Sequence, residues 1–286
     1  MLRAIEPLLN RRSSSREKML WLLERAHLLR HVNLTVHHDV AGRSFRIPVK
    51  DGLHAMDAEP WMDKLIARLL SIRPGGFVDV GVNLGQTLMK LKAVAPDAPY
   101  FGFEPNPRCY CYVSDLIALN DLRDCKVYPV ALGERPEIVQ LFQGSAADAG
   151  ASLVEGFRRE DHYSSRQFVT VFPGDQILGG RASQQLSIVK IDVEGGEREV
   201  IKGMAATIDR DRPFIICEVL PVYDTSDSIG KMRLERQKEI EDFLRKRQYS
   251  IQRVDDEARL TKVSEFGIHS QLSDSNYVFA PAERPV

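Results

Sequence analysis

The stretch Phe77-Val-Asp-Val-Gly-Val-Asn-Leu-Gly-Gln86 decides the fold that we expect from this sequence. Its apolar beginning predicts a buried strand, and its end predicts the first turn of a helix. Gly81 and Gly85 lack side chains where the backbone between strand and helix must pass close to a ligand. Such a loop is a weak signal by itself, because dinucleotide-binding enzymes use a related loop and purely structural turns also need glycine.

Two acidic residues restrict the kinds of ligand that this loop can bind. A dinucleotide loop brings the pattern G-x-G-x-x-G up to a pyrophosphate, whereas this chain has Asn83 in place of the middle glycine. Asp79 would repel a pyrophosphate but suits a ligand that carries an ammonium and a sulfonium. Glu104 ends the next apolar strand, where an acid accepts hydrogen bonds from both hydroxyls of a ribose. The sequence therefore predicts a positively charged nucleoside ligand and argues against an NAD(P)-dependent oxidoreductase.

A turn follows Glu104. Pro105 and Pro107 fix this turn and open a helix. Asn106 between them either reaches the sugar or only forms an Asx-turn, and the sequence leaves both interpretations open.

Strands and helices alternate through most of the chain. Strands that alternate with helices of this length predict a parallel sheet covered on both faces. We expect strands at 77–81, 100–104, 126–131, 138–142, 168–172, 186–192, 213–218, 249–254 and 276–280, and helices at 85–94, 107–119, 197–204 and 232–247. The irregular stretch 144–167 is the candidate lid or substrate loop.

The segment before this domain has a different pattern. Residues 16–30 approximate a helical stripe, and 32–40 and 44–49 predict a β-hairpin. A further helix starts after Pro60 and leads into the first core strand. We therefore expect an N-terminal helix and β-hairpin cap over 1–58 and a catalytic domain over 59–286.

Four separated motifs resemble the FkbM family of S-adenosylmethionine-dependent methyltransferases. They are Asp79-Val-Gly-Val-Asn-Leu-Gly-Gln86, Phe103-Glu-Pro-Asn-Pro107, Val130-Ala-Leu-Gly133 and Ile188-Val-Lys-Ile-Asp-Val-Glu-Gly-Gly-Glu197. Their order and spacing match the family from about residue 75 to 220, and this is more specific than the glycine loop alone.

The resemblance implies an α/β fold of the class I methyltransferase type, which is Rossmann-like. Its seven-stranded sheet has the order 3-2-1-4-5-7-6, with the last strand antiparallel. The implied reaction moves the methyl group of S-adenosyl-L-methionine to a hydroxyl oxygen of a sugar, glycan or natural-product scaffold. The alternatives are N-methylation of a sugar or peptide amine, and an inactive S-adenosylmethionine-binding interaction module.

The resemblance also implies the cofactor contacts. Asp79, Gly81 and Gly85 would line the methionine and ribose portion, Glu104 would hold the ribose, and Ala131 would lie near the adenine. The other expected cofactor contacts from the motifs are Asn83, Gln86, Pro105, Asn106 and Asp192.

The catalytic candidates follow a buried strand. Methyl transfer is an in-line displacement, so the enzyme chiefly supplies orientation, and a hydroxyl acceptor must also lose its proton. Lys190, Asp192 and Glu194 alternate and project to one face if the strand continues that far. Alternatively, Lys190 and Asp192 form a buried ion pair and Glu194 caps the next helix.

Three further sites have candidate residues. Glu218 ends the next strand and with Asp192 offers oxygen ligands to Mg²⁺, although acidic strand ends also pair with basic neighbours, so a divalent metal is not favoured. His162, next to Tyr163, has the pKa of a general base in the loop, although a lone loop histidine is more often solvated. Ser152 is a weak candidate for the acceptor pocket.

The composition excludes several other classes. With 39 basic and 40 acidic residues, no global field favours nucleic acid, and a small-molecule or glycan acceptor is expected. No apolar run approaches the ~20 residues of a membrane span, and the charged N-terminus does not resemble a secretory signal, so we expect a cytoplasmic protein. The four cysteines lack a zinc spacing and are expected to be buried free thiols. The acceptor and the oligomeric state are left open.

Overall fold

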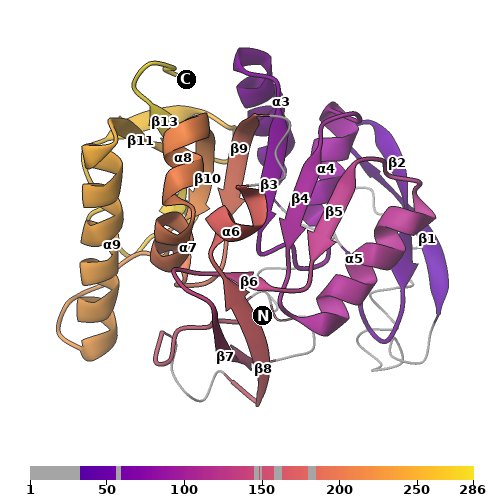
Figure 1. Ribbon diagram of the computed structural model, residues 1–286, viewed down its shortest axis with the longest axis horizontal. Coiled ribbons are helices and arrows are strands. Elements are labelled where there is room, and N and C mark those ends of the chain that lie inside the picture. The colour runs from indigo at the N-terminus through magenta and orange to yellow at the C-terminus, as the bar shows by residue number, and fades with distance from the viewer. Residues whose placement is uncertain (1–32, 56–58, 145–147, 149, 158–162, 180–184) are drawn as a thin grey trace.

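The computed structural model describes residues 33–286 except 56–58, 145–147, 149, 158–162 and 180–184. The expected helix at 16–30 and His162 lie outside the described residues. An eight-stranded sheet runs through the described chain, with helices on both of its faces (Figure 1). Its strands, in order across the sheet, are β12 (Leu260–Val263), β11 (Tyr249–Val254), β13 (Asn276–Pro281), β10 (Phe214–Glu218), β9 (Leu186–Ile191), β3 (Gly76–Val80), β4 (Tyr100–Phe103) and β5 (Cys125–Tyr128).

The strand order of the main sheet confirms most of the prediction. Without β12, the strands numbered along the chain follow the order 3-2-1-4-5-7-6 from β5 onwards, and β13 is antiparallel to both of its neighbours. The predicted count of seven is wrong, because β12 pairs with β11 as an eighth strand at the edge. Its sequence signal is weak because this short strand alternates little, with Thr261 and Lys262 both exposed.

Each face of the sheet has its own hydrophobic core. Phe77 of β3 and Ile188 of β9 belong to one core and Val78 and Val189 to the other, since successive side chains of a strand point to opposite faces. The helices that contribute to the first core are α3 (Met62–Ile72), α4 (Gln86–Val94) and α5 (Pro107–Leu119). Those that contribute to the second are α6 (Gly174–Leu178), α7 (Glu197–Gly203), α8 (Ala205–Asp211) and α9 (Ser228–Lys246).

A separate three-stranded sheet lies below the main sheet in Figure 1. It has the order β6-β8-β7, with β6 (Ala131–Leu132), β8 (Ser165–Phe172) and β7 (Glu137–Gln143). The strands expected at 138–142 and 168–172 are thereby confirmed. The strand expected at 126–131 is divided into β5 and β6, and α8 follows α7 where we expected one helix.

The N-terminal hairpin packs into the first core. β1 (Leu34–Val40) and β2 (Arg43–Val49) pair antiparallel, as the sequence predicts. Phe45 is fully buried in this core. The Tyr112 hydroxyl of α5 donates a hydrogen bond to the Pro48 carbonyl at 2.7 Å, and Arg43 donates to the Lys92 carbonyl at 2.6 Å. The hairpin therefore shares its core with α4 and α5.

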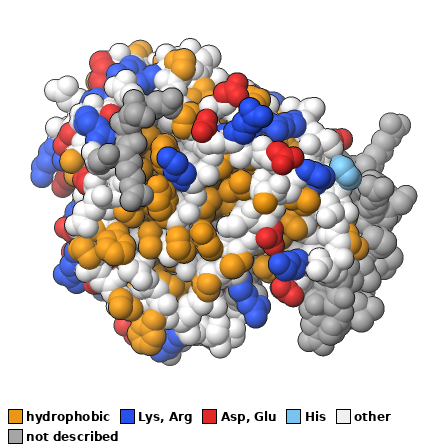
Figure 2. Space-filling view, turned by 45° about the vertical axis from the view of Figure 1, so that its right-hand side comes forward, with side chains coloured by type: hydrophobic (Ala, Val, Ile, Leu, Met, Phe, Trp, Pro, Cys, Tyr) orange, Lys and Arg blue, Asp and Glu red, His pale blue; other side chains and the backbone are white. Residues whose placement is uncertain are grey.

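The surface carries charges of both signs. On the face shown in Figure 2, hydrophobic side chains gather in the middle, and acidic and basic side chains alternate around them. Within the described ranges, no helix is long and apolar enough to cross a membrane. All four cysteines are free, and Cys109 and Cys217 are buried as expected, but Cys111 of α5 is exposed and Cys125 is half-buried, which corrects the expectation for these two.

Candidate functional site

The loop between β3 and α4 adopts the backbone conformation that its glycines allow. Gly81 and Gly85 have φ values of 86° and 85°, and Asn83 between them has a φ of 51°. All three lie in the left-handed region, which favours glycine and tolerates asparagine. A Cβ atom on Gly81 would collide with the Asp192 carbonyl oxygen. Gly81 therefore lets the loop lie directly against the chain that leaves β9.

Glu104 joins this loop to the turn after β4. Its Oε2 accepts a hydrogen bond from the Asn83 N–H at 2.7 Å, and its Oε1 accepts from the Asn106 N–H at 2.8 Å. Only 6% of Glu104 is exposed. Burial raises the pKa of its carboxyl group to about 7, and the two backbone donors limit that rise. The carboxylate is thus held at the carboxyl end of β4 with lone pairs left for a ligand.

Asn106 forms the Asx-turn that was one of its two predicted roles. Its side chain accepts a hydrogen bond from the Arg108 N–H at 3.0 Å and caps α5, and its amide donates to Gln143 of β7 at 3.3 Å. The structure therefore shows the Asx-turn directly. Contact with a sugar stays a prediction.

A cavity opens between these loops and the small sheet. The expected cofactor and catalytic residues that line it are Gly81, Asn83, Glu104, Pro105, Asn106, Ala131, Asp192 and Glu194. Sequence reasoning missed Cys109, Leu141, Asp148 and Leu153 in the same lining, because helix and loop side chains of mixed type carry no binding pattern. The cavity lies outside the carboxyl ends of β3, β4 and β9, where open α/β sheets bind ligands.

Three expected cofactor residues lie outside this lining. Asp79 is fully buried beneath the loop, Gly85 directly precedes α4, and Gln86 is the first residue of α4. A Cβ atom on Gly85 would lie 2.8 Å from a methyl group of Leu116 in α5. Gly85 thus serves the packing of α4 against α5.

Asp79 belongs to a buried charge network. The Tyr100 hydroxyl donates to its Oδ2 at 2.7 Å, and the Lys190 Nζ lies 3.7 Å from its Oδ1. Burial raises the pKa of the Asp79 carboxyl group, and Lys190 opposes that rise. Lys190 also lies 3.0 Å from the Asp192 Oδ2. Burial disfavours the ammonium, but Asp192 and Asp79 outweigh it and raise the Lys190 pKa above its ordinary value.

The ion pair between Lys190 and Asp192 was one of the alternatives left open by the sequence, and it is present. The other part of that alternative is not observed, because Gly196 and not Glu194 is the cap residue of α7. The assumption that the strand continues to Glu194 is also wrong. β9 ends at Ile191, and Glu194 has a φ of 53°, which turns the chain.

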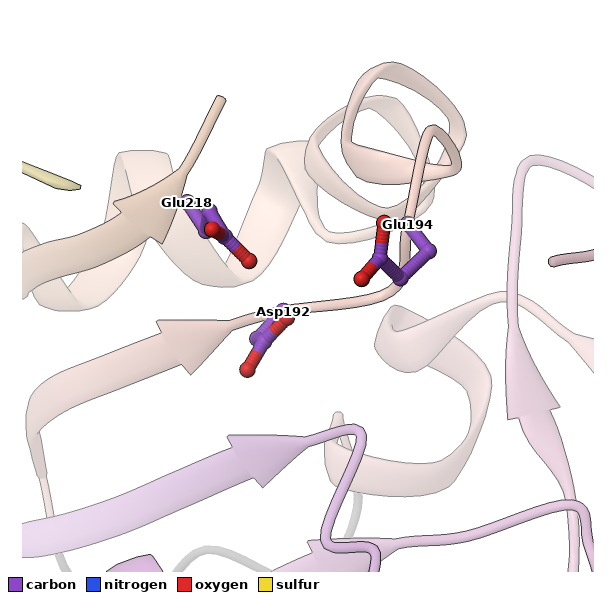
Figure 3. Close-up of side chains that lie close together, drawn as sticks. All are labelled: Asp192, Glu194 and Glu218. Carbon is purple, nitrogen blue, oxygen red and sulfur yellow. The ribbon is translucent and has the colours of Figure 1, made fainter. Parts of the chain in front are cut away.

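Three carboxylates nevertheless converge at the carboxyl ends of β9 and β10, and two of them, Asp192 and Glu194, line the cavity. Asp192, Glu194 and Glu218 offer oxygen atoms that lie within 4.8 Å of one another, and Figure 3 shows their side chains pointing toward a common space. Glu218 accepts a hydrogen bond from the Ser275 hydroxyl at 3.0 Å. Burial, followed by the charges of Asp192 and Glu194, raises the Glu218 pKa to about 9.

A fourth acid, Glu59, was missed in the sequence. Burial raises the pKa of its carboxyl group, and Lys190 lowers it while Asp192 raises it further. Glu59 therefore shares the electrostatic environment of Lys190 and Asp192, although it precedes α3 and belongs to no motif.

The remaining candidates have structural contacts. The Ser152 hydroxyl donates to the Glu194 carbonyl at 2.7 Å and thereby fastens the irregular loop to the end of β9. The Tyr163 ring packs on Phe142, with centroids 5.6 Å apart.

The strand order and the cavity at the carboxyl ends of the parallel strands define a class I methyltransferase fold. The chain belongs to the FkbM methyltransferase family, because the model of the methyltransferase FkbM domain matches residues 79–251. Within that range lie the glycine loop, Glu104 and all three converging carboxylates.

Known proteins are similar over different spans. Methyltransferase sdnD of Sordaria araneosa is 25% identical over 153 residues, which cover 44% of this chain and 59% of that protein. Methyltransferase FkbM from Methylobacillus flagellatus KT is 18% identical with a TM-score of 0.45, over 72% of this chain and 43% of that chain. An O-methyltransferase from Bacillus cereus in complex with SAH is 11% identical with a TM-score of 0.46, over 97% and 94%.

Proposed function

We propose that this chain transfers the methyl group of S-adenosyl-L-methionine to a hydroxyl oxygen of a sugar, glycan or natural-product scaffold. The observation that carries this proposal is the buried Glu104 carboxylate, which lines the cavity while Asn83 and Asn106 hold it through their backbone N–H groups. A carboxylate at this strand end suits the two hydroxyls of a ribose. Membership of the FkbM methyltransferase family supports the same reaction.

The cofactor contacts in this proposal come from predicted residues that line the cavity. They are Gly81, Asn83, Glu104, Pro105, Asn106, Ala131 and Asp192. Asp79 is fully buried outside this lining, Gly85 is the cap residue of α4, and Gln86 is the first residue of α4.

We propose that the acceptor binds where Asp192 and Glu194 line the cavity and Glu218 lies next to them, which we call the acceptor end, whereas the cofactor end is formed by Gly81, Asn83 and Glu104. S-adenosyl-L-methionine provides a methyl group that leaves sulfur for the attacking acceptor oxygen, with the electron pair of the broken bond remaining on sulfur. Asp192 takes the proton that the acceptor hydroxyl loses, because its carboxylate lines the cavity and Lys190 stabilises its charge. Glu194 accepts a hydrogen bond from the acceptor. Glu218 lies outside the cavity lining; with a pKa of about 9 it is protonated at neutral pH and donates a hydrogen bond to Asp192.

The same residues fit a divalent metal poorly at neutral pH. Three carboxylates would offer oxygen ligands to a hard cation. However, the Lys190 ammonium already lies 3.0 Å from Asp192, and a cation would have to displace the proton of Glu218. We therefore propose that methyl transfer proceeds without a bound metal.

Labelled S-adenosyl-L-methionine tests the proposed function. The protein is incubated with fractions of cell metabolites and glycans, and we expect one fraction to take up the labelled methyl group with release of S-adenosylhomocysteine. Mass spectrometry of the product shows whether the methyl group is on oxygen or on nitrogen. A protein that binds S-adenosyl-L-methionine but labels no fraction is the inactive module, and the proposal then fails.

A further inference from the structure

Two charged residues lie side by side within an apolar face of the main sheet. Asp79 of β3 pairs in register with Lys190 of β9, and on its other side with Gly102 of β4. The same face carries Phe77 and Ile188 one step earlier on the two strands, both of them fully buried. Removing two charges from water costs several kcal/mol per ion, and apolar residues at such positions are often neutral or stabilising. Packing alone therefore gives no reason for this pair.

Tyr100 is placed to reach Asp79 along this face. Tyr100 is fully buried, and its hydroxyl donates to the Asp79 Oδ2 at 2.7 Å. Its ring lies over Gly102, where a Cβ atom would be 2.9 Å from the Tyr100 Cε1 and 3.1 Å from its hydroxyl oxygen. The missing side chain of Gly102 thus makes room for the ring beside Asp79.

Lys190 connects this buried pair to the cavity. Its ammonium lies 3.7 Å from the Asp79 Oδ1, 3.4 Å from the Gly81 carbonyl oxygen and 3.0 Å from the Asp192 Oδ2. Gly81 belongs to the cofactor loop, and Asp192 lies at the acceptor end. The Lys190 ammonium therefore contacts both the cofactor loop, at Gly81, and the acceptor end, at Asp192.

We propose that Tyr100 and Asp79 are positioning residues, which hold the Lys190 ammonium and through it the Asp192 carboxylate at the site of methyl transfer. The inference rests on the proposed methyl transfer and assigns Asp79 a role without direct cofactor contact. The ammonium donates hydrogen bonds to the Gly81 carbonyl and the Asp192 carboxylate, and Asp79 attracts it as an ion pair at 3.7 Å. Loss of the Asp79 contact lets the ammonium, and with it Asp192, leave the geometry that transfer requires.

The test compares Tyr100→Phe with Tyr112→Phe. Tyr112 is a matched control, because it is also buried and its hydroxyl donates at 2.7 Å, but to the Pro48 carbonyl of the hairpin. The Tyr112 hydroxyl also accepts a hydrogen bond from the Ala55 N–H at 2.8 Å, so Tyr112→Phe should lose at least as much thermal stability as Tyr100→Phe. With the extract fraction that takes up label as acceptor, Tyr100→Phe should lower kcat about tenfold, and its affinity for S-adenosylhomocysteine should change less than about twofold.

Tyr112→Phe should keep its kcat within about twofold. A folded Tyr100→Phe protein with the kcat of the wild type overturns the positioning role. Equal losses of kcat in both variants also overturn it, because they reveal a general effect of lost stability.

The lysine ammonium signals give a readout that needs no acceptor. The Lys190 signal in a ¹H–¹⁵N spectrum is assigned through its loss in Lys190→Arg, and Asp79→Asn and Tyr100→Phe should both shift it. An unchanged signal in both variants overturns the inference even in an active enzyme. If the wild type labels no acceptor, the proposed function fails, and these spectra still decide whether Asp79 and Tyr100 hold the ammonium.

Discussion

The two ends of the cavity hold their carboxylates in different ways. At the cofactor end, Glu104 accepts hydrogen bonds from the backbone N–H groups of Asn83 and Asn106. At the acceptor end, side chains hold the carboxylates: the Lys190 ammonium holds Asp192 and the Ser275 hydroxyl holds Glu218. Backbone donors are fixed by the loop conformation, whereas side-chain donors come from residues that can be replaced separately. The geometry of the cofactor end therefore depends on the conformation of two loops, whereas the geometry of the acceptor end depends on individual side chains.

The ends also differ in charge. Among the described residues, Glu104 accepts hydrogen bonds from two backbone N–H groups, whereas the carboxylate oxygens of Asp192, Glu194 and Glu218 lie within 4.8 Å of one another. Burial alone is the leading reason for the Glu104 pKa of about 7, while neighbouring acids help to raise the Glu218 pKa to about 9. Binding and chemistry should thus respond to different substitutions and to different ranges of pH.

The largest effect is expected at the acceptor end. Asp192→Asn should lower kcat about 100-fold, because a positioned base contributes about 10²–10⁴ to proton transfer. Its affinity for S-adenosylhomocysteine, measured by calorimetry, should stay within about threefold. Asp255→Asn is the control, since the Asp255 side chain is 44% exposed and its partners among the described residues, Glu257 and Arg259, belong to its own turn. A loss of cofactor affinity that equals the loss of kcat would assign Asp192 to the cofactor end.

Glu104→Ala should weaken cofactor binding, whereas Asp192→Asn should lower kcat. We expect at least a tenfold loss of affinity for S-adenosyl-L-methionine, which corresponds to about 1.4 kcal/mol. Glu218→Gln is the control from the acceptor end and should bind the cofactor as the wild type does. Unchanged affinity in a folded Glu104→Ala protein would remove the observation on which the proposed function depends.

The same division explains how far the sequence predicted the site. The cofactor end was predictable because Gly81, Asn83 and Glu104 lie in two short motifs, and their positions follow from one strand-to-helix unit and the next. Even there the sequence could not show that Asp79 is fully buried outside the cavity lining, since a strand pattern does not show whether a side chain reaches the cavity or a buried neighbour. The helix expected at 107–119 agrees with α5 because Asn106 and Pro107 start it with local chemistry.

The acceptor end was less predictable because its residues meet only through the tertiary fold. Glu218 contacts Ser275, which is far away in the chain, and Glu59 enters from the segment before α3. The alternation of Lys190, Asp192 and Glu194 predicted that these residues lie together, but the reason was wrong, since β9 ends before the last two. The turn that places Glu194 near Asp192 and Glu218 depends on the left-handed conformation of Glu194, which few sequence patterns predict.

A pH titration of cofactor affinity sharpens the contrast at the cofactor end. The ionised Glu104 carboxylate accepts two hydroxyl hydrogen bonds, whereas its protonated form has lost part of that capacity. With a Glu104 pKa of about 7, affinity for S-adenosyl-L-methionine should fall as the pH drops from 8 to 5, by at most about tenfold per pH unit. Calorimetry at several pH values checks this. A flat profile down to pH 5 would mean that Glu104 does not take part.

Stability should respond to pH through the acceptor end. Between the ordinary glutamate pKa of 4.5 and about 9, folded Glu218 keeps a proton that the unfolded chain releases. Its contribution to stability therefore falls as the pH rises through this range. Glu218→Gln keeps a hydrogen-bond donor and cannot ionise, so its Tm at pH 8 should exceed that of the wild type by about 2 °C or more. If the wild type and Glu218→Gln have the same Tm as each other at pH 5 and again at pH 8, the raised Glu218 pKa is contradicted.

The smallest effect is expected from removing divalent metal. The acceptor end has the carboxylates of a cation site, but Lys190 lies against Asp192, and Glu218 retains a proton at neutral pH. Addition of EDTA at pH 7 should therefore change kcat by less than about twofold. Above pH 9, where Glu218 ionises, the three acids become a better site, and Mg²⁺ should then raise the Tm. Loss of activity in EDTA at pH 7 and its recovery with Mg²⁺ would instead make the acceptor end a metal centre, with Lys190 displaced from Asp192.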